Sequence, residues 1–175
     1  MILRAAPLIA AALVLVACSA PAPTTSAPTS SKDAALETSA TPATRSPLQA
    51  AVLGTALTIT TAGATAVYTV ADLRPVPVEA QIIPAKGAMY AVDVTIDAQT
   101  GTTVYNGFYF VARAQDGSSI PPAVGAVKPG INSGELSQGQ TIDGHVAFDV
   151  PPGQSITQVG LRDAKGATLA VWGVG

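Results

Sequence analysis

The chain has 175 residues and a formal net charge of -2, with 11% charged residues against 48% hydrophobic ones. Its lysines and arginines are dispersed rather than gathered in a stripe, which argues against nucleic acid as a partner. A single cysteine excludes an internal disulfide, so burial of apolar side chains alone has to stabilise the folded part.

The N-terminus has the layout of an export signal. Arg4 supplies a positive charge, and the apolar residues 5–16 are too few to span a bilayer as a helix. The run Leu15-Val16-Ala17-Cys18 resembles the bacterial lipobox, in which the cysteine is diacylglycerylated and the peptide is cleaved before it. We therefore predict a lipoprotein signal peptide over residues 1–17. The alternative is an ordinary secretory signal that ends in a cysteine by chance.

Cys18 is the predicted lipidation site. Each buried methylene of an acyl chain contributes about 0.8 kcal/mol, so one chain holds a protein only marginally and two or three, palmitate among them, hold it stably. We expect a protein attached to the outer face of the cell membrane, with the membrane as its partner through acyl chains on Cys18.

Residues 18–50 predict a lipidated, disordered stalk. After the cysteine this stretch is built almost wholly from Ser, Thr, Ala and Pro, which cannot bury a core. The functional interpretation is a spacer that lifts a domain off the membrane, and the alternative is an unselective low-complexity tail. The density of Ser, Thr and Pro would also suit O-glycosylation.

Residues 51–175 are sufficient for one hydrophobic core, and their periodicity is that of strands. Apolar and β-branched residues alternate over short runs that Gly, Pro, Asn and Asp separate. Three prolines predict an edge or an irregular crossing over residues 73–85. The clearest strand follows, and its inward face should carry Tyr90, Val92, Val94 and Ile96.

The later runs extend the same pattern. Phe108, Phe110 and Ala112 should share one face, and Asp116-Gly117 is a turn signal. A further strand should point one set of residues inward, namely Ile142, Gly144, Val146, Phe148 and Val150. About seven or eight short strands of this spacing predict an all-β, antiparallel sandwich.

Four short blocks carry a resemblance to a known family. They are Leu53-Gly54-Thr55-Ala56-Leu57-Thr58, Val70-Ala71-Asp72-Leu73, Phe110-Val111-Ala112-Arg113 with Asp116-Gly117, and residues 136–151. The chain resembles the immunoprotective extracellular, immunoglobulin-like proteins, which are small mycobacterial secreted antigens. The last block is also similar to a wider group of uncharacterised bacterial surface domains.

The resemblance implies an immunoglobulin-like β-sandwich, an actinobacterial source and export, and it supplies no catalytic residues. Those antigens are secreted free, whereas this chain carries a lipobox and a stalk, so their soluble state is not carried over. The disulfide and adjoining Trp of antibody domains are also missing. We interpret Trp172 as a core or lid residue.

His145 is the one histidine and the first candidate for catalysis. A triad would need Asp143 or Asp149 to orient it and a serine to reach it. The available serines are Ser118, Ser119, Ser133, Ser137 and Ser155. None lies in Gly-x-Ser-x-Gly, and the histidine face of the strand should be solvated, so we predict no enzyme.

Metal and cofactor sites are not predicted either. One His and scattered carboxylates give no zinc spacing, and no Asp-x-Asp-x-Asp-Gly loop for calcium occurs. Asp93 and Asp97 share a strand face but should lie about 13 Å apart along it. Their spacing is simply that of a polar sheet face.

The segment 115–140 is rich in Gly and Pro and long for a connection. Its candidate binding residues are Ile120, Val124, Lys128 and Ile131. One interpretation is a recognition loop that contacts an envelope or host protein. The favoured alternative is that the segment hides a short strand or covers one end of the sandwich.

The function predicted from sequence is a non-catalytic surface module that binds a protein or another envelope component, with no cofactor. The alternative is a carrier of a small apolar or lipid ligand, for which the sandwich would have to open between its sheets. A domain of this size should instead fill that space with Val92, Val94, Ile96, Phe108, Phe110, Val146 and Phe148. A closed core with no cavity would exclude the carrier.

Overall fold

The computed structural model describes residues 48–175. The predicted signal peptide, the lipobox with Cys18, and the predicted stalk up to residue 47 lie outside the described residues. The first strand starts at Gln49, just before the predicted domain boundary at residue 51.

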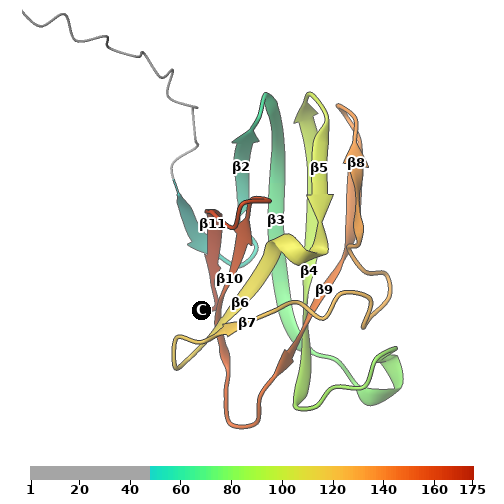
Figure 1. Cartoon of the computed structure of the whole chain (residues 1–175), viewed down its shortest axis with the longest axis vertical. Coiled ribbons are helices and arrows are strands. Elements are labelled where there is room, and N and C mark those ends of the chain that lie inside the picture. The colour runs from blue at the N-terminus through green and yellow to red at the C-terminus, as the bar shows by residue number, and fades with distance from the viewer. Residues whose placement is uncertain (1–47) are drawn as a thin grey trace, which may run out of the picture. The chain divides into compact units, whose positions relative to one another are not determined.

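The described residues form an immunoglobulin-like β-sandwich, as the sequence predicts (Figure 1). The β10 sheet consists, in spatial order, of β1 (Gln49–Val52), β11 (Thr168–Gly173), β10 (Ile156–Arg162), β6 (Phe110–Ala114) and β7 (Ser119–Ile120). The β4 sheet consists of β2 (Ala56–Thr61), β3 (Ala64–Pro75), β4 (Ala88–Thr100) and β9 (Thr141–Val150). A two-stranded ribbon pairs β5 (Thr103–Asn106) with β8 (Ser133–Leu136).

Seven strands in residues 48–175 have five or more residues, close to the number expected, and the other four are shorter pieces. One pairing departs from the predicted antiparallel arrangement. β1 runs parallel to β11, with Gln49 opposite Ala170 and Val52 opposite Gly173. Strands so short carry too little alternation to be recognised in sequence.

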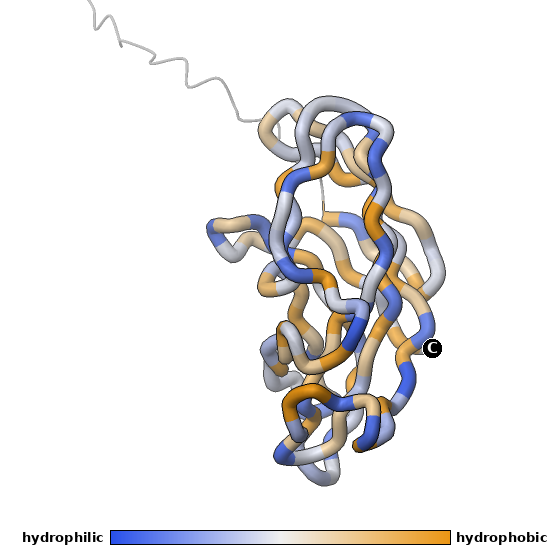
Figure 2. The backbone as a smooth tube through the Cα atoms, turned by 90° about the vertical axis from the view of Figure 1, so that its right-hand side faces the viewer, coloured by the Kyte–Doolittle hydropathy of each residue, from blue (hydrophilic) through white to orange (hydrophobic). Residues whose placement is uncertain are grey.

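The alternation predicted for β4 and β9 is confirmed. The two strands pair in register, so that Tyr90 lies opposite Phe148 and Val94 opposite Gly144. Val92, Val94, Ile96, Phe148 and Val150 are all at most 1% exposed. Figure 2 shows hydrophobic and hydrophilic bands alternating along much of the backbone tube, as expected for strands with one buried face.

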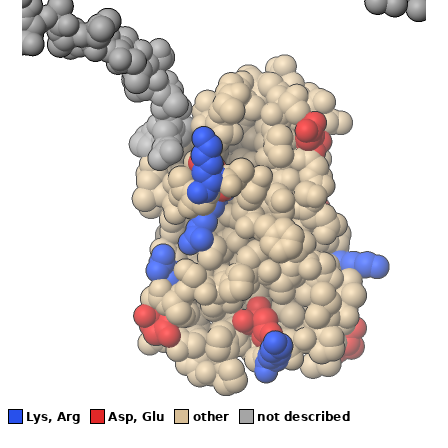
Figure 3. Space-filling model, in the orientation of Figure 1, with Lys and Arg blue, Asp and Glu red and all other residues tan. Residues whose placement is uncertain are grey.

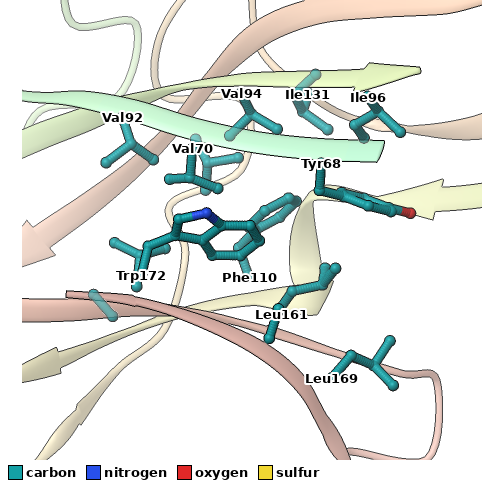
Figure 4. Close-up of a cluster of buried hydrophobic side chains, with 14 of the residues drawn as sticks. Tyr68, Val70, Val92, Val94, Ile96, Phe110, Ile131, Leu161, Leu169 and Trp172 are labelled. Carbon is teal, nitrogen blue, oxygen red and sulfur yellow. The ribbon is translucent and has the colours of Figure 1, made fainter. Parts of the chain in front are cut away.

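The middle of the sandwich is filled by large side chains from both sheets (Figure 4). Trp172 on β11 is fully buried, and its Nε1 donates a hydrogen bond of 2.8 Å to the carbonyl of Thr55. Phe110 on β6 is 1% exposed and Val70 on β3 is fully buried. Trp172 is therefore a core residue, one of the two roles expected for it.

Phe108 corrects the sequence analysis, which placed it in the core. The chain makes a 3-10 turn there, η2 (Gly107–Tyr109), in which the N–H of Phe108 donates to the side chain of Asn106. This turn breaks the two-residue alternation before β6 begins, and Phe108 is left 67% exposed. A side chain at Gly107 would collide with the carbonyl of Ile131. The absence of a side chain at Gly107 therefore allows the turn to pack closely against the segment that contains Ile131.

The proline-rich stretch forms the irregular crossing that was expected. β3 ends at Pro75, and a 3-10 turn, η1 (Val78–Ala80), leads into a loop that returns to β4. Val78, Ile82 and Ile83 on this crossing are all more than half exposed. Three large apolar side chains therefore face solvent on one loop.

The segment 115–140 contains the short strands β7 and β8 and packs on the β4 sheet, which confirms the favoured interpretation. Ala126 and Val127 form a small second core with Met89, Ala91 and Ala147, on the side of the sheet away from Trp172. The backbone near Pro129 extends the β9 edge, because the N–H of His145 donates to the Pro129 carbonyl at 2.8 Å.

Candidate functional site

His145 belongs to a polar cluster on the outer face of the β4 sheet. Register places it opposite Asp93, and its Nδ1 lies 2.7 Å from Asp93 Oδ1. Arg74 from β3 places Nη2 2.8 Å from the same oxygen. The Arg74 guanidinium, and to a smaller extent His145, hold the pKa of Asp93 below its ordinary value. The side chains of Arg74 and His145 thus share one carboxylate oxygen.

The two carboxylates considered for a triad have other partners. Asp143 accepts a hydrogen bond from the Thr95 hydroxyl at 2.5 Å. Asp149 accepts from the backbone N–H groups of Lys86 and Gly87, at 2.8 and 2.9 Å. Among residues 48–175, no serine hydroxyl makes a hydrogen bond with His145. The described residues therefore do not assemble the nucleophile, base and orienting acid that the chemistry requires.

The candidate binding residues of the 115–140 segment are split by burial. Ile120 and Ile131 are 4% and 2% exposed and pack in the main core. Val124 is half-buried, and Lys128 is exposed. The two isoleucines therefore face away from solvent, and a binding role for the loop stays a prediction that concerns Val124 and Lys128.

A cleft of about 400 Å³ lies at one end of the sandwich. One wall comes from β2 and its turn, residues 59–62, with Tyr68 of β3. The other wall comes from the β10–β11 hairpin, residues 161–165 and 169. Val104 of β5 and Tyr109 of η2 complete it.

The cleft exists because the two sheets differ in extent. Figure 1 shows that the β2–β3 hairpin, β5 and β8 continue past the turn that joins β10 to β11. Beyond that turn the inner face of the β4 sheet loses its partner layer, so a gap opens beside the packed middle. Most of the molecular face seen in Figure 3 is uncharged, with scattered Lys, Arg, Asp and Glu side chains.

The β10–β11 turn is held by its own carboxylate. Asp163 Oδ1 accepts hydrogen bonds from the N–H groups of Lys165 and Ala167, at 2.9 and 2.8 Å. Gly166 closes the turn at φ +83°, a value that favours glycine. Arg162 and Lys165 flank the carboxylate and take part in no ion pair of the described residues. The rim of the cleft thus offers two cations whose charge is not neutralised by a direct partner.

Tyr68 is the polar group set deepest in the cleft. It is 7% exposed, and Figure 4 shows its hydroxyl directed away from Trp172 and Phe110. Burial, with a smaller contribution from the nearby Tyr109, raises the pKa of Tyr68 to about 12. No hydrogen bond joins its hydroxyl to another residue in the range 48–175. The phenol therefore stays protonated and has an unused donor.

The described part of the chain contains neither a membrane-spanning helix nor a cluster of metal ligands. No helix in residues 48–175 is long and apolar enough to cross a membrane. Within the same residues, no group of three His, Cys, Asp or Glu side chains is placed to hold a metal ion.

Sequence reasoning missed this cleft. Its residues form no motif, because they come from six elements that meet only in the folded domain. One local signal was available. Tyr68 lies between Ala66 and Val70 on the inward face of β3, where a hydroxyl needs a partner that the neighbouring residues do not supply.

Comparisons with known proteins place this domain. MPT63, a secreted protein from Mycobacterium tuberculosis, is similar with a TM-score of 0.63 and 25% identity, over 71% of this chain and 95% of that one. The yjhA protein from Bacillus subtilis has a TM-score of 0.46 and 15% identity, over 63% and 80%. An uncharacterised β-sandwich protein from Clostridium difficile has a TM-score of 0.44 and 14% identity, over 75% and 97%.

None of the curated proteins matches the chain. MPT63 is described as a secreted protein, with no enzymatic activity named. The family model that matches residues 48–172 is described as a domain of unknown function, DUF1942. The match and the MPT63 fold confirm the resemblance to the mycobacterial secreted antigens. This chain belongs to the DUF1942 family.

Proposed function

We propose that the protein is a non-catalytic domain, held by lipid on the outer face of the cell membrane, that binds a small apolar ligand in the end cleft. The observation that supports a bound ligand is the cleft itself, since a fully closed sandwich would have excluded a carrier. From the sequence, a protein-binding module was the predicted function and a carrier of a small ligand was the alternative; the cleft reverses this order. The carrier now stands before the protein-binding module.

The cellular location is supported from two sides. MPT63, which shares the fold, is a secreted protein. The sequence Leu15-Val16-Ala17-Cys18 adds a lipid attachment to export. A domain so placed meets ligands of the envelope rather than metabolites of the cytoplasm.

The absence of catalysis is supported by the polar cluster. His145 shares Asp93 with Arg74, and no serine hydroxyl of the described residues reaches it. The cleft residues provide one carboxylate, Asp163, which is already used by the turn. A binding site needs neither a nucleophile nor a general base.

The ligand class is supported by volume and lining. Pockets for small ligands hold roughly 300–1,000 Å³ and are mostly apolar with a few polar groups. The cleft has about 400 Å³ and is lined by Ile59, Leu161 and Leu169 among others. It therefore suits one compact apolar ligand and is too small for a folded partner.

Attachment is tested by replacing Cys18 with Ser. The expected result is release of the protein from the membrane fraction and loss of metabolic labelling by an alkyne-tagged fatty acid. As a control, Ser19→Ala should leave both unchanged. Unaltered membrane association and labelling of the Cys18→Ser variant would refute lipidation at this cysteine.

Ligand binding is tested with N-phenyl-1-naphthylamine, an apolar dye that brightens when it leaves water. The wild-type domain should bind it, and Ala164→Trp, which adds a ring to the cleft wall, should weaken binding by about tenfold or more. The matched control is Ala80→Trp, an exposed position on η1 that is not part of the cleft. Absence of binding to the wild type, or equal loss in both variants, would contradict the proposal.

A second candidate, contact with an envelope or host protein, is favoured by the crossing loop. Val78, Ile82 and Ile83 are 78%, 51% and 52% exposed, and such apolar clusters mark interaction sites. Photocrosslinkers placed at Val78 on intact cells should capture a defined neighbour. Capture that is identical from Thr157, an exposed residue of β10 outside the cleft, would show that the loop has no preference.

A further inference from the structure

We propose that the ligand of the end cleft is an anionic amphiphile, whose hydrocarbon chain lies against Ile59, Leu161 and Leu169 and whose carboxylate accepts a hydrogen bond from Tyr68 near Lys165. The inference rests on the proposed function and adds the chemistry of the ligand. It joins three features of the cleft that the fold alone does not require.

The first feature is an apolar floor that continues the core. Ile59, Leu161 and Leu169 are 3%, 2% and 6% exposed and also belong to the main core cluster. A chain of methylenes laid on this floor gains about 0.8 kcal/mol for each one that leaves water. The volume of about 400 Å³ corresponds to roughly a dozen water molecules at about 30 Å³ each, which suits a single acyl chain.

The second feature is the unused donor of Tyr68. A hydroxyl that faces a small, mostly apolar cleft is one of the few polar groups that can fix the orientation of a ligand there. Tyr68 is 7% exposed as a residue, its hydroxyl makes no hydrogen bond to another residue of the range 48–175, and its oxygen is open to the cleft rather than sealed in the core. Because its pKa is raised to about 12, it remains a donor at physiological pH. The complementary ligand group is an acceptor, and a carboxylate is the strongest common one.

The third feature is the charge of the rim. The ionisable groups of the lining, apart from the tyrosines, are Arg162, Asp163 and Lys165. Asp163 already accepts two backbone hydrogen bonds within its turn, whereas neither cation has an ion-pair partner among the described residues. Their sum is positive, which favours an anion over a neutral or cationic head group.

Lys165 is the better test of that charge. Arg162 also borders a shallow groove on the outer face of the β10 sheet, with Arg113 and Gln158, so its substitution would disturb both places. Lys165 borders only the cleft of these two and is exposed on the turn, where Lys165→Gln keeps the length and removes the charge.

The experiment measures displacement of N-phenyl-1-naphthylamine by dodecanoate and by 1-dodecanol, which share a chain and differ in the head group. The readout is the ratio of the two affinities, since a general loss of packing lowers both alike. The wild type should prefer dodecanoate by roughly tenfold or more, the range of a hydrogen bond to a charged group. Tyr68→Phe should bring the ratio to within about threefold of unity.

Lys165→Gln should lower the preference for dodecanoate severalfold, and added salt should lower it more in the wild type than in this variant, which keeps Arg162. Lys86→Gln, on the loop before β4, is the matched control and should keep the wild-type ratio. Equal affinities for both ligands in the wild type, or a ratio unchanged by Tyr68→Phe, would overturn the anionic ligand while dye binding upholds the cleft. Failure of the dye to bind would instead refute the proposed function.

Discussion

The middle of the sandwich, where both sheets face each other, and its open end, where the β4 sheet extends further, are filled differently. In the middle, Trp172 is fully buried and its one polar atom is bonded to Thr55. At the open end of the sandwich, Tyr68 is nearly as buried as Trp172, but its hydroxyl has no hydrogen-bond partner among the described residues and faces a cleft. The difference shows that the ligand space arises from unequal strand lengths, because packing is tight wherever both sheets are present.

The largest expected effect comes from emptying the middle. Trp172→Ala should lower the free energy of unfolding by about 3–5 kcal/mol, because it leaves a cavity and an unpaired Thr55 carbonyl. Urea unfolding followed by far-ultraviolet circular dichroism measures the change. Trp172→Phe, which keeps an aromatic ring, should cost clearly less. A loss below about 1.5 kcal/mol for the alanine variant would mean that the middle is loosely packed.

The open end should reveal itself at alkaline pH. Tyr68 has an ordinary pKa of 10.0 and a folded-state pKa of about 12, so its contribution to stability is complete below pH 10 and is lost as pH rises toward 12. Between these values the wild type should lose about 2 kcal/mol more than Tyr68→Phe. Urea unfolding at several pH values compares the two proteins. Parallel curves would show that Tyr68 is not buried as described.

The outer face of the β4 sheet should give a smaller change in stability, and this change should occur in acid rather than in alkali. The pKa of Asp93 is lowered, so its stabilising contribution is present above the ordinary value of 3.8 and disappears as pH falls below it. Asp93→Asn should reduce stability at pH 7 by less than about 1 kcal/mol, because the carboxylate is partly exposed. The gap between the two proteins should close in acid. If the difference in stability between wild type and Asp93→Asn instead grew in acid, the Asp93 carboxylate would not be stabilised by Arg74 and His145 as described.

The smallest effect concerns Phe108. Phe108→Ala should change the free energy of unfolding by no more than about 0.5 kcal/mol, because its ring is 67% exposed. Phe110→Ala, two residues later, should cost about 3–5 kcal/mol. Thermal unfolding of both variants is a sufficient measurement. Similar losses for the two would return Phe108 to the core, where its sequence pattern placed it.

The long strands were predictable because one face of each is buried. The inward residues of β4 and β9 alternate without interruption, and the structure buries Val92, Val94, Val146 and Phe148 as expected. The exposure of Phe108 was not predictable in this way. Phe108 lies in a turn that precedes β6, and the two-residue alternation does not continue across it. The Asn106 side chain that caps η2 is a short-range signal of that turn, and it was not used.

The candidate site was beyond sequence reasoning for another reason. His145 and Asp143 attract notice as residue types, yet cross-strand register gives His145 to Asp93 and Asp143 to Thr95. This register is set by the pairing of β4 with β9, two strands that are far apart in the chain, so the residues near His145 in the sequence do not reveal its partner. The cleft depends likewise on where β10 stops relative to β2 and β3, which no local pattern encodes.

Trp172 is the one tryptophan of the chain, and its burial makes it an optical reporter. Its emission should be that of an indole out of water and should move to longer wavelength when the domain unfolds. Tyr68 and Tyr109 belong to the same domain and absorb where they can pass excitation to the indole. The part of the Trp172 emission that arises by transfer from tyrosines would therefore include a contribution from the cleft, read through a side chain outside its lining.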